Sequence, residues 1–176
     1  MNQKKKRFFP ITLAIWPYLY ATLLFSVPTT YEVLSELILW GGMVLTLVFY
    51  ISHIIYACIC KGEDAYYNLA FWNMLIKLLH IPFYLCIFLI GVFFLLAAVV
   101  PVFTFVAPIL IFCLFLVDVF LMVTSSMYGV NALLRAGKKQ MVSKTYVIIN
   151  IILQFLFVAD VISAVVLYIK LRKKRF

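Results

Sequence analysis

The sequence has little charge. Only 12% of its 176 residues are Asp, Glu, Lys or Arg, and only 6 are acidic. A soluble domain is about a quarter charged and nearer half apolar, whereas this chain is 67% hydrophobic with a mean hydropathy of +1.15. The composition excludes an ordinary soluble domain. Apolar runs of 18 or more residues recur instead, which is typical of transmembrane helices.

Motifs of catalysis and nucleotide binding are also missing. The sequence has no P-loop, H-E-x-x-H, G-x-S-x-G or dinucleotide fingerprint, and no evident nucleophile–base pair. Cys58 and Cys60 are closely spaced, but the sequence has no second such pair of cysteines. We therefore interpret the four cysteines as small apolar residues rather than as disulfides or zinc ligands. The histidines and aspartates are too scattered for a metal site. We therefore expect no enzyme, no catalytic residues, no metal and no cofactor.

Basic residues outnumber acidic ones by 15 to 6, for a net charge of +9. They cluster at the ends of apolar segments, where Lys and Arg set membrane topology and meet anionic lipid headgroups. We expect the lipid bilayer to be the partner of these basic loops. Nucleic acid is not expected, because no RNA- or DNA-binding motif is present.

The apolar segments predict an all-α, polytopic transmembrane bundle that forms a single domain over 1–176. Pro101 and Pro108 bracket a turn, because the apolar block 78–130 would be about 80 Å long as one helix. Residues 65–80 have apolar side chains at helical spacing, which predicts an amphipathic interfacial helix before the third span. We expect five spans, at about 8–27, 37–60, 82–100, 103–126 and 146–169.

The distribution of basic residues favours a cytoplasmic amino terminus. Five crossings, however, leave the basic tail 170–175 on the outer side. Either the tail is a tolerated exception or one segment fails to cross. The fifth segment is the candidate for that, because Asn150, Gln154 and Asp160 lower its hydrophobicity. Of the two, we favour five crossings.

Asp118 and Asp160 lie in the middle of predicted spans, where a carboxyl group needs a partner, a water-filled cavity or a function. With five spans the two carboxyls lie at similar depths. Two interpretations are open. In the first, the two carboxyls line a path for protons or cations. In the second, each is protonated or bonded to a neighbouring helix and holds the helices together. The candidate residues of this intramembrane polar site are Asp160, Asp118, Gln154, Asn150, His53 and Ser125.

A second polar feature is an interfacial stripe on the predicted helix 65–80. Asn73, Lys77 and His80 recur at steps of three or four residues, so they share one face. We expect Lys77 to extend its ammonium group to water without needing a partner.

Three stretches resemble a group of small, uncharacterised multi-pass proteins of Gram-positive bacteria. They are SSMYGVNAL at 125–133, QFLFVADVISA at 154–164 and NMLIKLLHIP at 73–82, and the resemblance covers roughly the last 110 residues. It implies a bacterial plasma-membrane protein of unknown function, and no catalytic residue carries over. Asp160 and the interfacial stripe fall inside these stretches, whereas Asp118 does not.

Two functions follow from these observations. The leading hypothesis is transport or permeation of a small ion or solute through the polar interior. Because five spans make a thin bundle, a pore would form between the subunits of a homo-oligomer. The alternative is a non-transporting accessory, sensor or immunity protein of the membrane, whose intramembrane polar residues fix helix packing.

Overall fold

A computed structural model describes residues 3–26, 32–60, 62, 64–156 and 158–173. Over these residues the protein is all-helical and has no strand, which confirms the predicted class. The helices are α1 (Gln3–Ser26), α2 (Glu32–Ile59), α3 (Ala65–Ala97), α4 (Val106–Lys138), α5 (Lys144–Leu153) and α6 (Ala159–Lys173).

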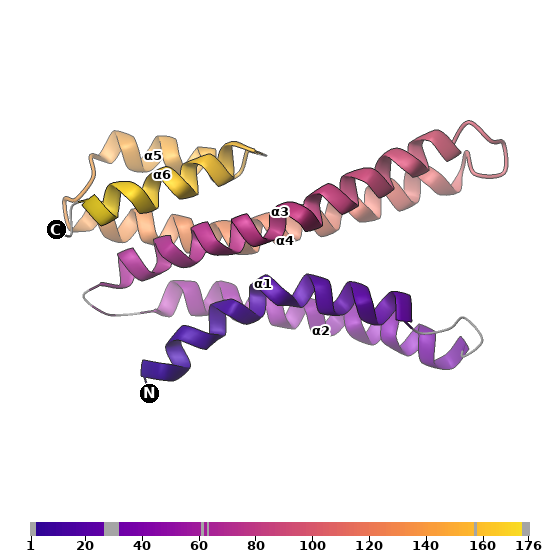
Figure 1. Cartoon of the computed structure of the whole chain (residues 1–176), viewed down its shortest axis with the longest axis horizontal. Coiled ribbons are helices and arrows are strands. Elements are labelled where there is room, and N and C mark those ends of the chain that lie inside the picture. Colours follow the sequence, from indigo (N-terminus) through magenta and orange to yellow (C-terminus); the bar gives the residue numbers. More distant parts are fainter. Residues whose placement is uncertain (1–2, 27–31, 61, 63, 157, 174–176) are drawn as a thin grey trace.

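The helices form three antiparallel hairpins in chain order (Figure 1). The long α3–α4 pair lies in the middle: α1 and α2 pack on one side of it, and the short α5–α6 pair packs on the other. Within the short pair, α6 contacts α3 most extensively and α5 contacts α4. The first and last described residues lie at the same end of the molecule (Figure 1).

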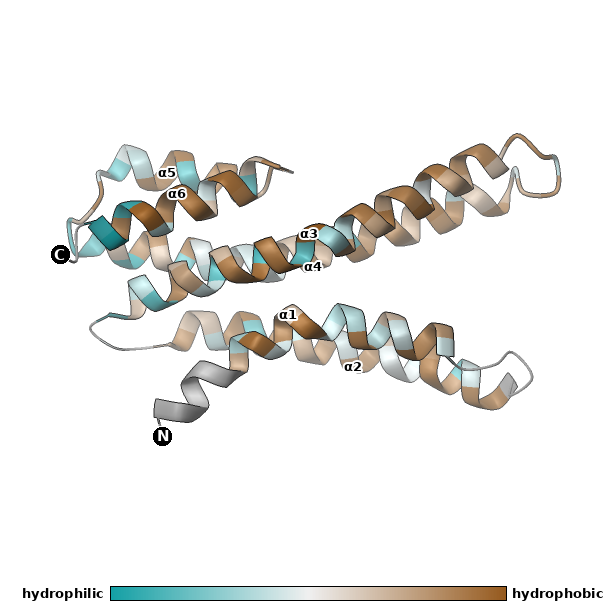
Figure 2. Cartoon of the chain, viewed as in Figure 1, coloured by the Kyte–Doolittle hydropathy of each residue, from teal (hydrophilic) through white to brown (hydrophobic). Residues whose placement is uncertain are grey.

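Four helices are long and apolar enough to cross a membrane, over Phe9–Ser26, Val33–Ile59, Ala65–Ala97 and Val106–Lys138. Hydrophobic residues dominate the halves of α3 and α4 that lie far from the chain ends, and hydrophilic residues gather near the ends (Figure 2). Many large apolar side chains are exposed on these helices. Such a surface suits contact with lipid and would be an aggregation hazard in water.

The predicted fifth span, 146–169, is not one helix. The helix α5 ends at Leu153, and α6 begins at Ala159 and runs back toward the start of α5. Val158 takes part in the reversal with a positive φ of 66°, which is unusual for a β-branched residue. The structure therefore differs from the prediction of five crossings. Lys61, Lys174 and Arg175 lie outside the described residues.

The predicted interfacial helix and third span are also different from what the structure shows. Both belong to one continuous helix, α3, which passes through Pro82. A proline inside a helix is tolerated where a neighbouring helix satisfies the backbone groups that it frees. The predicted turn is confirmed, because residues 98–105 connect α3 to α4. Pro108 falls in the first turn of α4, where its missing N–H costs nothing.

Candidate functional site

A buried ion pair joins α3 to α6. The Lys77 ammonium nitrogen lies 2.9 Å from a carboxylate oxygen of Asp160, and the two residues are 0% and 4% exposed. Lys77 also donates hydrogen bonds to the Ser126 hydroxyl, at 3.0 Å, and to the Gln154 backbone carbonyl, at 3.3 Å. An ammonium group has three donors, so all three are used within the chain. Lys77 therefore does not reach water as the sequence led us to expect.

The break between α5 and α6 supplies two of these acceptors. Gln154 is the C-cap of α5, and its carbonyl accepts from Lys77 and, at 2.6 Å, from the Ser126 hydroxyl. A helix carboxyl end carries partial negative charge and a helix amino end partial positive charge. Asp160 lies in the first turn of α6. The positive Lys77 thus lies at the carboxyl end of α5, and the negative Asp160 lies at the amino end of α6. Each helix end stabilises the charge that is placed there.

A chain of amide and hydroxyl groups continues from the ion pair. Asn73 donates to the Gln154 side-chain oxygen at 3.3 Å, and the Gln154 amide donates to Ser163 at 3.4 Å. Ser163 in turn donates to Asn150 at 3.0 Å. Gly129 of α4 makes room for this chain, because a Cβ atom there would lie 2.6 Å from the Gln154 oxygen and 2.7 Å from the Asn73 nitrogen.

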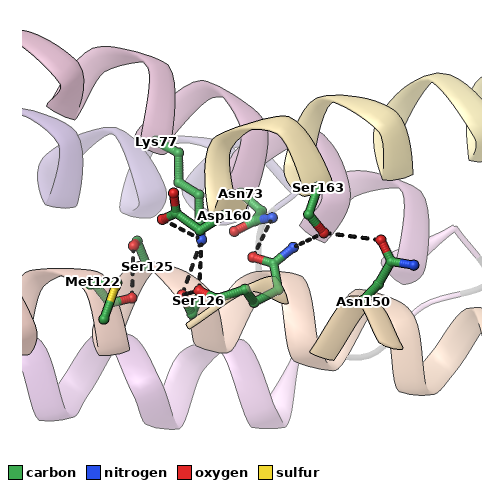
Figure 3. A network of polar contacts seen from close by, with 9 residues as sticks. Asn73, Lys77, Met122, Ser125, Ser126, Asn150, Asp160 and Ser163 are labelled. Atoms are coloured by element: carbon green, nitrogen blue, oxygen red, sulfur yellow. Dashed lines mark hydrogen bonds and ion pairs between the residues drawn. The ribbon is translucent and has the colours of Figure 1, made fainter. Parts of the chain in front are cut away.

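We call these residues the polar cluster. Its members come from α3, α4, α5, α6 and the turn between the last two, and most are drawn in Figure 3 with their hydrogen bonds. The polar cluster consists of Asn73, Lys77, Ser126, Asn150, Gln154, Asp160 and Ser163. All of them are buried. Leaving one partner of a buried ion pair unmatched is strongly destabilising, so this cluster holds the α5–α6 hairpin against the α3–α4 pair.

Asp118 does not belong to the polar cluster. It precedes Ser126 by eight residues on α4, or about 12 Å along the helix axis. It is partly exposed, and its buried Oδ1 atom has no hydrogen-bond partner in the described part of the chain. Tyr84 of α3 lies within electrostatic reach of both Asp118 and Asp160. Ser125 donates to the Met122 carbonyl at 3.0 Å (Figure 3).

His53 lies in another seam, between α1, α2 and α4. Its ring is 0% exposed. Its Nδ1 atom is 2.8 Å from the Tyr128 hydroxyl, and its Nε2 atom is 3.3 Å from the Thr12 hydroxyl. The ring stacks on Phe9 with centroids 4.2 Å apart. The structure therefore gives His53 partners other than the two aspartates.

His80 joins α3 to α1 at their prolines. Pro17 has no N–H to offer the Leu13 carbonyl four residues earlier. The His80 Nε2 atom lies 3.3 Å from that carbonyl and serves as its donor. In the other direction, Tyr18 of α1 donates to the Leu79 carbonyl, close to Pro82 in α3. His80 thus supplies a donor for the carbonyl that Pro17 leaves without its helical partner, and the Tyr18 bond is a second link between the two helices near Pro82.

Comparison with known proteins gives one match. The model of a family of unknown function, DUF6652, matches residues 8–173. The chain belongs to this family. The matched range includes the whole polar cluster and Asp118. The expected resemblance to an uncharacterised family is confirmed to that extent, while the Gram-positive source stays a prediction. No curated protein and no solved structure matches the chain.

In this DUF6652 member, the sequence pointed to most of the polar cluster but not to its pairing. Ser126 and Gly129 were not candidates, and Lys77 and Asp160 were assigned to separate features. One signal was available: Lys77 is the cation that the sequence places within an apolar helix, and a mid-span aspartate needs a partner. Within the part that the structure describes, no three His, Cys, Asp or Glu residues are grouped to hold a metal ion.

Proposed function

We propose that this chain is an integral protein of a bacterial plasma membrane with four crossings, and that it acts as an accessory, sensor or immunity protein rather than as a transporter. In this proposal its buried polar residues fix helix packing. The four long apolar helices support the membrane location. The resemblance to small multi-pass proteins supports the bacterial source.

The positions of the charges support a cytoplasmic location for both chain ends. Every Lys and Arg residue that the structure describes belongs to the first half of α3 or to a segment at the end of the molecule where the first and last described residues lie. At the opposite end, the α3–α4 turn over 98–105 has no charge, and Glu36 lies in the first two turns of α2. Positive charge is retained in the cytoplasm, so four crossings remove the conflict that five crossings create.

The observation that carries the packing role is the saturation of Lys77. Its three donors bind acceptors of the same chain, so the ammonium group has no donor left for a passing solute. The Gln154 and Asn73 side chains lie close against Gly129. A permeation path needs groups that release their ligand, whereas the polar groups of Lys77 and Gln154 are matched within the chain and closely packed. The proposal includes no enzymatic step, because the sequence has no nucleophile–base motif.

The test is ion flux through the purified protein. Wild-type protein is reconstituted into liposomes that contain a pH-sensitive dye, and proton flux is driven by a potassium gradient with valinomycin. Sodium and potassium flux are measured in parallel vesicles. We expect the flux to equal that of protein-free liposomes. Flux above that level, lost in the Asp118→Asn variant while its helix content is unchanged, would overturn the proposal.

One observation favours permeation as a second candidate. The Oδ1 atom of Asp118 is buried and has no hydrogen-bond partner among the described residues, and Tyr84 connects the region of Asp118 electrostatically with Asp160. An unmatched carboxyl group inside a membrane bundle is a candidate proton carrier. In this second function the path would pass Asp118 in a homo-oligomer, and the same flux measurement distinguishes the two.

A further inference from the structure

We infer that α5 and α6 form a re-entrant hairpin, which enters the membrane from the basic end of the molecule, turns inside the hydrocarbon and returns to the same side. Its outer face would lie against lipid acyl chains. The inference rests on the proposed membrane location. It does not depend on whether the protein transports a solute.

Between its open end and its turn, the outer face of the hairpin is apolar among the described residues. Ile148 and Ile152 of α5 lie one turn apart and are about as exposed as Ile162 and Val166 of α6, which also lie one turn apart. At the turn, Leu156 is 51% exposed. The side chains of Asn150, Gln154 and Ser163 point the other way, into the polar cluster. A hairpin that lay in water would show the opposite pattern.

Charge is confined to the open end of the hairpin. Between Thr145 and Ile169 the sequence has one charged residue, Asp160, and it is paired with Lys77. Lys144 lies at the start of α5, and Lys170 lies in the last turn of α6. From either lysine to the turn is about ten residues of helix, or about 15 Å, which is about half of a hydrocarbon core of about 30 Å.

The neighbouring helix α2 shows how deep the turn lies. The Arg135 guanidinium donates to the Cys58 carbonyl at 2.8 Å, so this part of α4 is level with the last residues of α2. Ser126, which binds Lys77, lies nine residues earlier on α4, or about 14 Å further in. The helix α2 is itself long and apolar enough to span the membrane from Val33 to Ile59. The hairpin turn is therefore level with the interior of that span.

Most of the carbonyls that the structure describes at the turn are hydrogen-bonded within the protein. Irregular backbone is tolerated at membrane depth only where its polar groups are bonded within the protein. The carbonyls that accept a hydrogen bond here are those of Asn150, Ile151, Ile152, Leu153, Gln154, Leu156 and Val158. For the Gln154 carbonyl the donors are Lys77 and Ser126 of the central pair. The ion pair is thus part of what permits a broken helix to lie inside the hydrocarbon.

Spin labels at single cysteines test the inference. In a protein whose Cys58, Cys60, Cys86 and Cys113 are replaced by Ala, nitroxide labels are placed by Ile162→Cys on the outer face, by Phe115→Cys on α4, and by Lys173→Cys at the open end. Phe115 is 56% exposed on a helix that is a candidate span, and Lys173 is exposed in the last turn of α6. The labelled proteins are reconstituted into phosphatidylcholine–phosphatidylglycerol vesicles, and circular dichroism checks their helix content.

The readout is the accessibility of each label to oxygen, which concentrates in lipid, relative to a nickel chelate, which stays in water. We expect the ratio at Ile162 to match that at Phe115 and to exceed that at Lys173 severalfold. A ratio at Ile162 as low as at Lys173, with a high ratio at Phe115, would overturn the inference. Protection of Ile162 from both reagents would overturn it as well, because a second copy would then cover the face. A low ratio at all three positions would instead refute the membrane location.

Discussion

The two halves of the α3–α4 pair differ both in sequence and in surroundings. Every buried residue of α3 except Ile87 lies between Ala65 and His80, and every buried residue of α4 except Ala107 lies at or after Leu121. We call these halves, up to His80 in α3 and from Leu121 in α4, the basic halves. They are covered by α6, and the polar cluster lies between them and the α5–α6 hairpin. The apolar halves, which continue to the turn over 98–105, expose large side chains.

A third helical layer, α5 and α6, decides whether a polar side chain of the α3–α4 pair finds a partner. Asp160 comes from that layer and meets Lys77 in the basic halves. Asp118 lies in the apolar half of α4, where α5 and α6 do not reach, and one of its oxygens has no bond in the described part of the chain. The cost of a buried carboxyl is thus offset in one region and not in the other.

The largest effect is expected for Asp160→Asn. It leaves the Lys77 ammonium buried without its counter-charge, and breaking a buried pair in this way costs about 3–5 kcal/mol of folding free energy. The measurement is thermal or denaturant unfolding in detergent, followed by circular dichroism. The control is the double variant Lys77→Met with Asp160→Leu, which removes both charges and should recover most of the loss. Equal stability of Asp160→Asn and wild type would contradict the role of the pair.

The next largest effect is expected from a matched pair of Gly→Ala variants, one in each half, whose stabilities are compared. Gly129→Ala in the basic half places a Cβ atom 2.6 Å from the Gln154 side-chain oxygen, and overpacking of this kind costs about 1–3 kcal/mol. Gly91→Ala in the apolar half of α3 meets no atom within 4 Å, so the better helix propensity of Ala should leave stability unchanged or raise it by up to about 1 kcal/mol. The same unfolding measurement compares them. Similar losses in both variants would argue against close packing as the difference.

A smaller effect is expected at the seam between α2 and α4. Tyr128→Phe removes the hydroxyl that bonds His53 and leaves a ring nitrogen of a fully buried histidine unmatched. The expected loss is about 1–2 kcal/mol, typical for an unsatisfied buried polar group. His53→Phe in the same background tests the coupling: if the bond matters, the double variant loses less than the sum of the single losses. Additive losses would indicate that the two side chains act independently.

The smallest effect on stability is expected for Asp118→Asn in the apolar half. Its Oδ1 atom has no hydrogen bond to lose among the described residues, so the change in unfolding free energy should stay within about 0.5 kcal/mol. Asp118→Leu should be neutral or stabilising. A loss as large as that of Asp160→Asn would show that Asp118 has a partner of comparable strength and would remove the contrast between the two halves.

Much of the fold followed from the sequence. The apolar runs and their length predicted α1, α2 and the α3–α4 hairpin, because a helix of that length must turn back within a bilayer. The fifth segment was harder. Its residues 146–169 are apolar enough to suggest a span, although five crossings would leave the basic tail 170–175 outside. Within the segment, Asn150, Gln154 and Asp160 indicated otherwise. The side chains of these three residues form hydrogen bonds with side chains on α3 and on the other side of the break between α5 and α6. Whether the segment crosses the membrane or turns back therefore depends on contacts that the local sequence does not contain.

Local sequence was enough to predict the all-α class, the apolar character of the long helices and the grouping of basic residues at particular helix ends. These depend on backbone hydrogen bonding and hydrophobicity, which are local. The tertiary structure decided that Lys77 meets Asp160 rather than water, that Asp118 remains outside this cluster, and that α5 and α6 turn back. These depend on which side chains distant in the chain approach within hydrogen-bond distance, and only packing sets that.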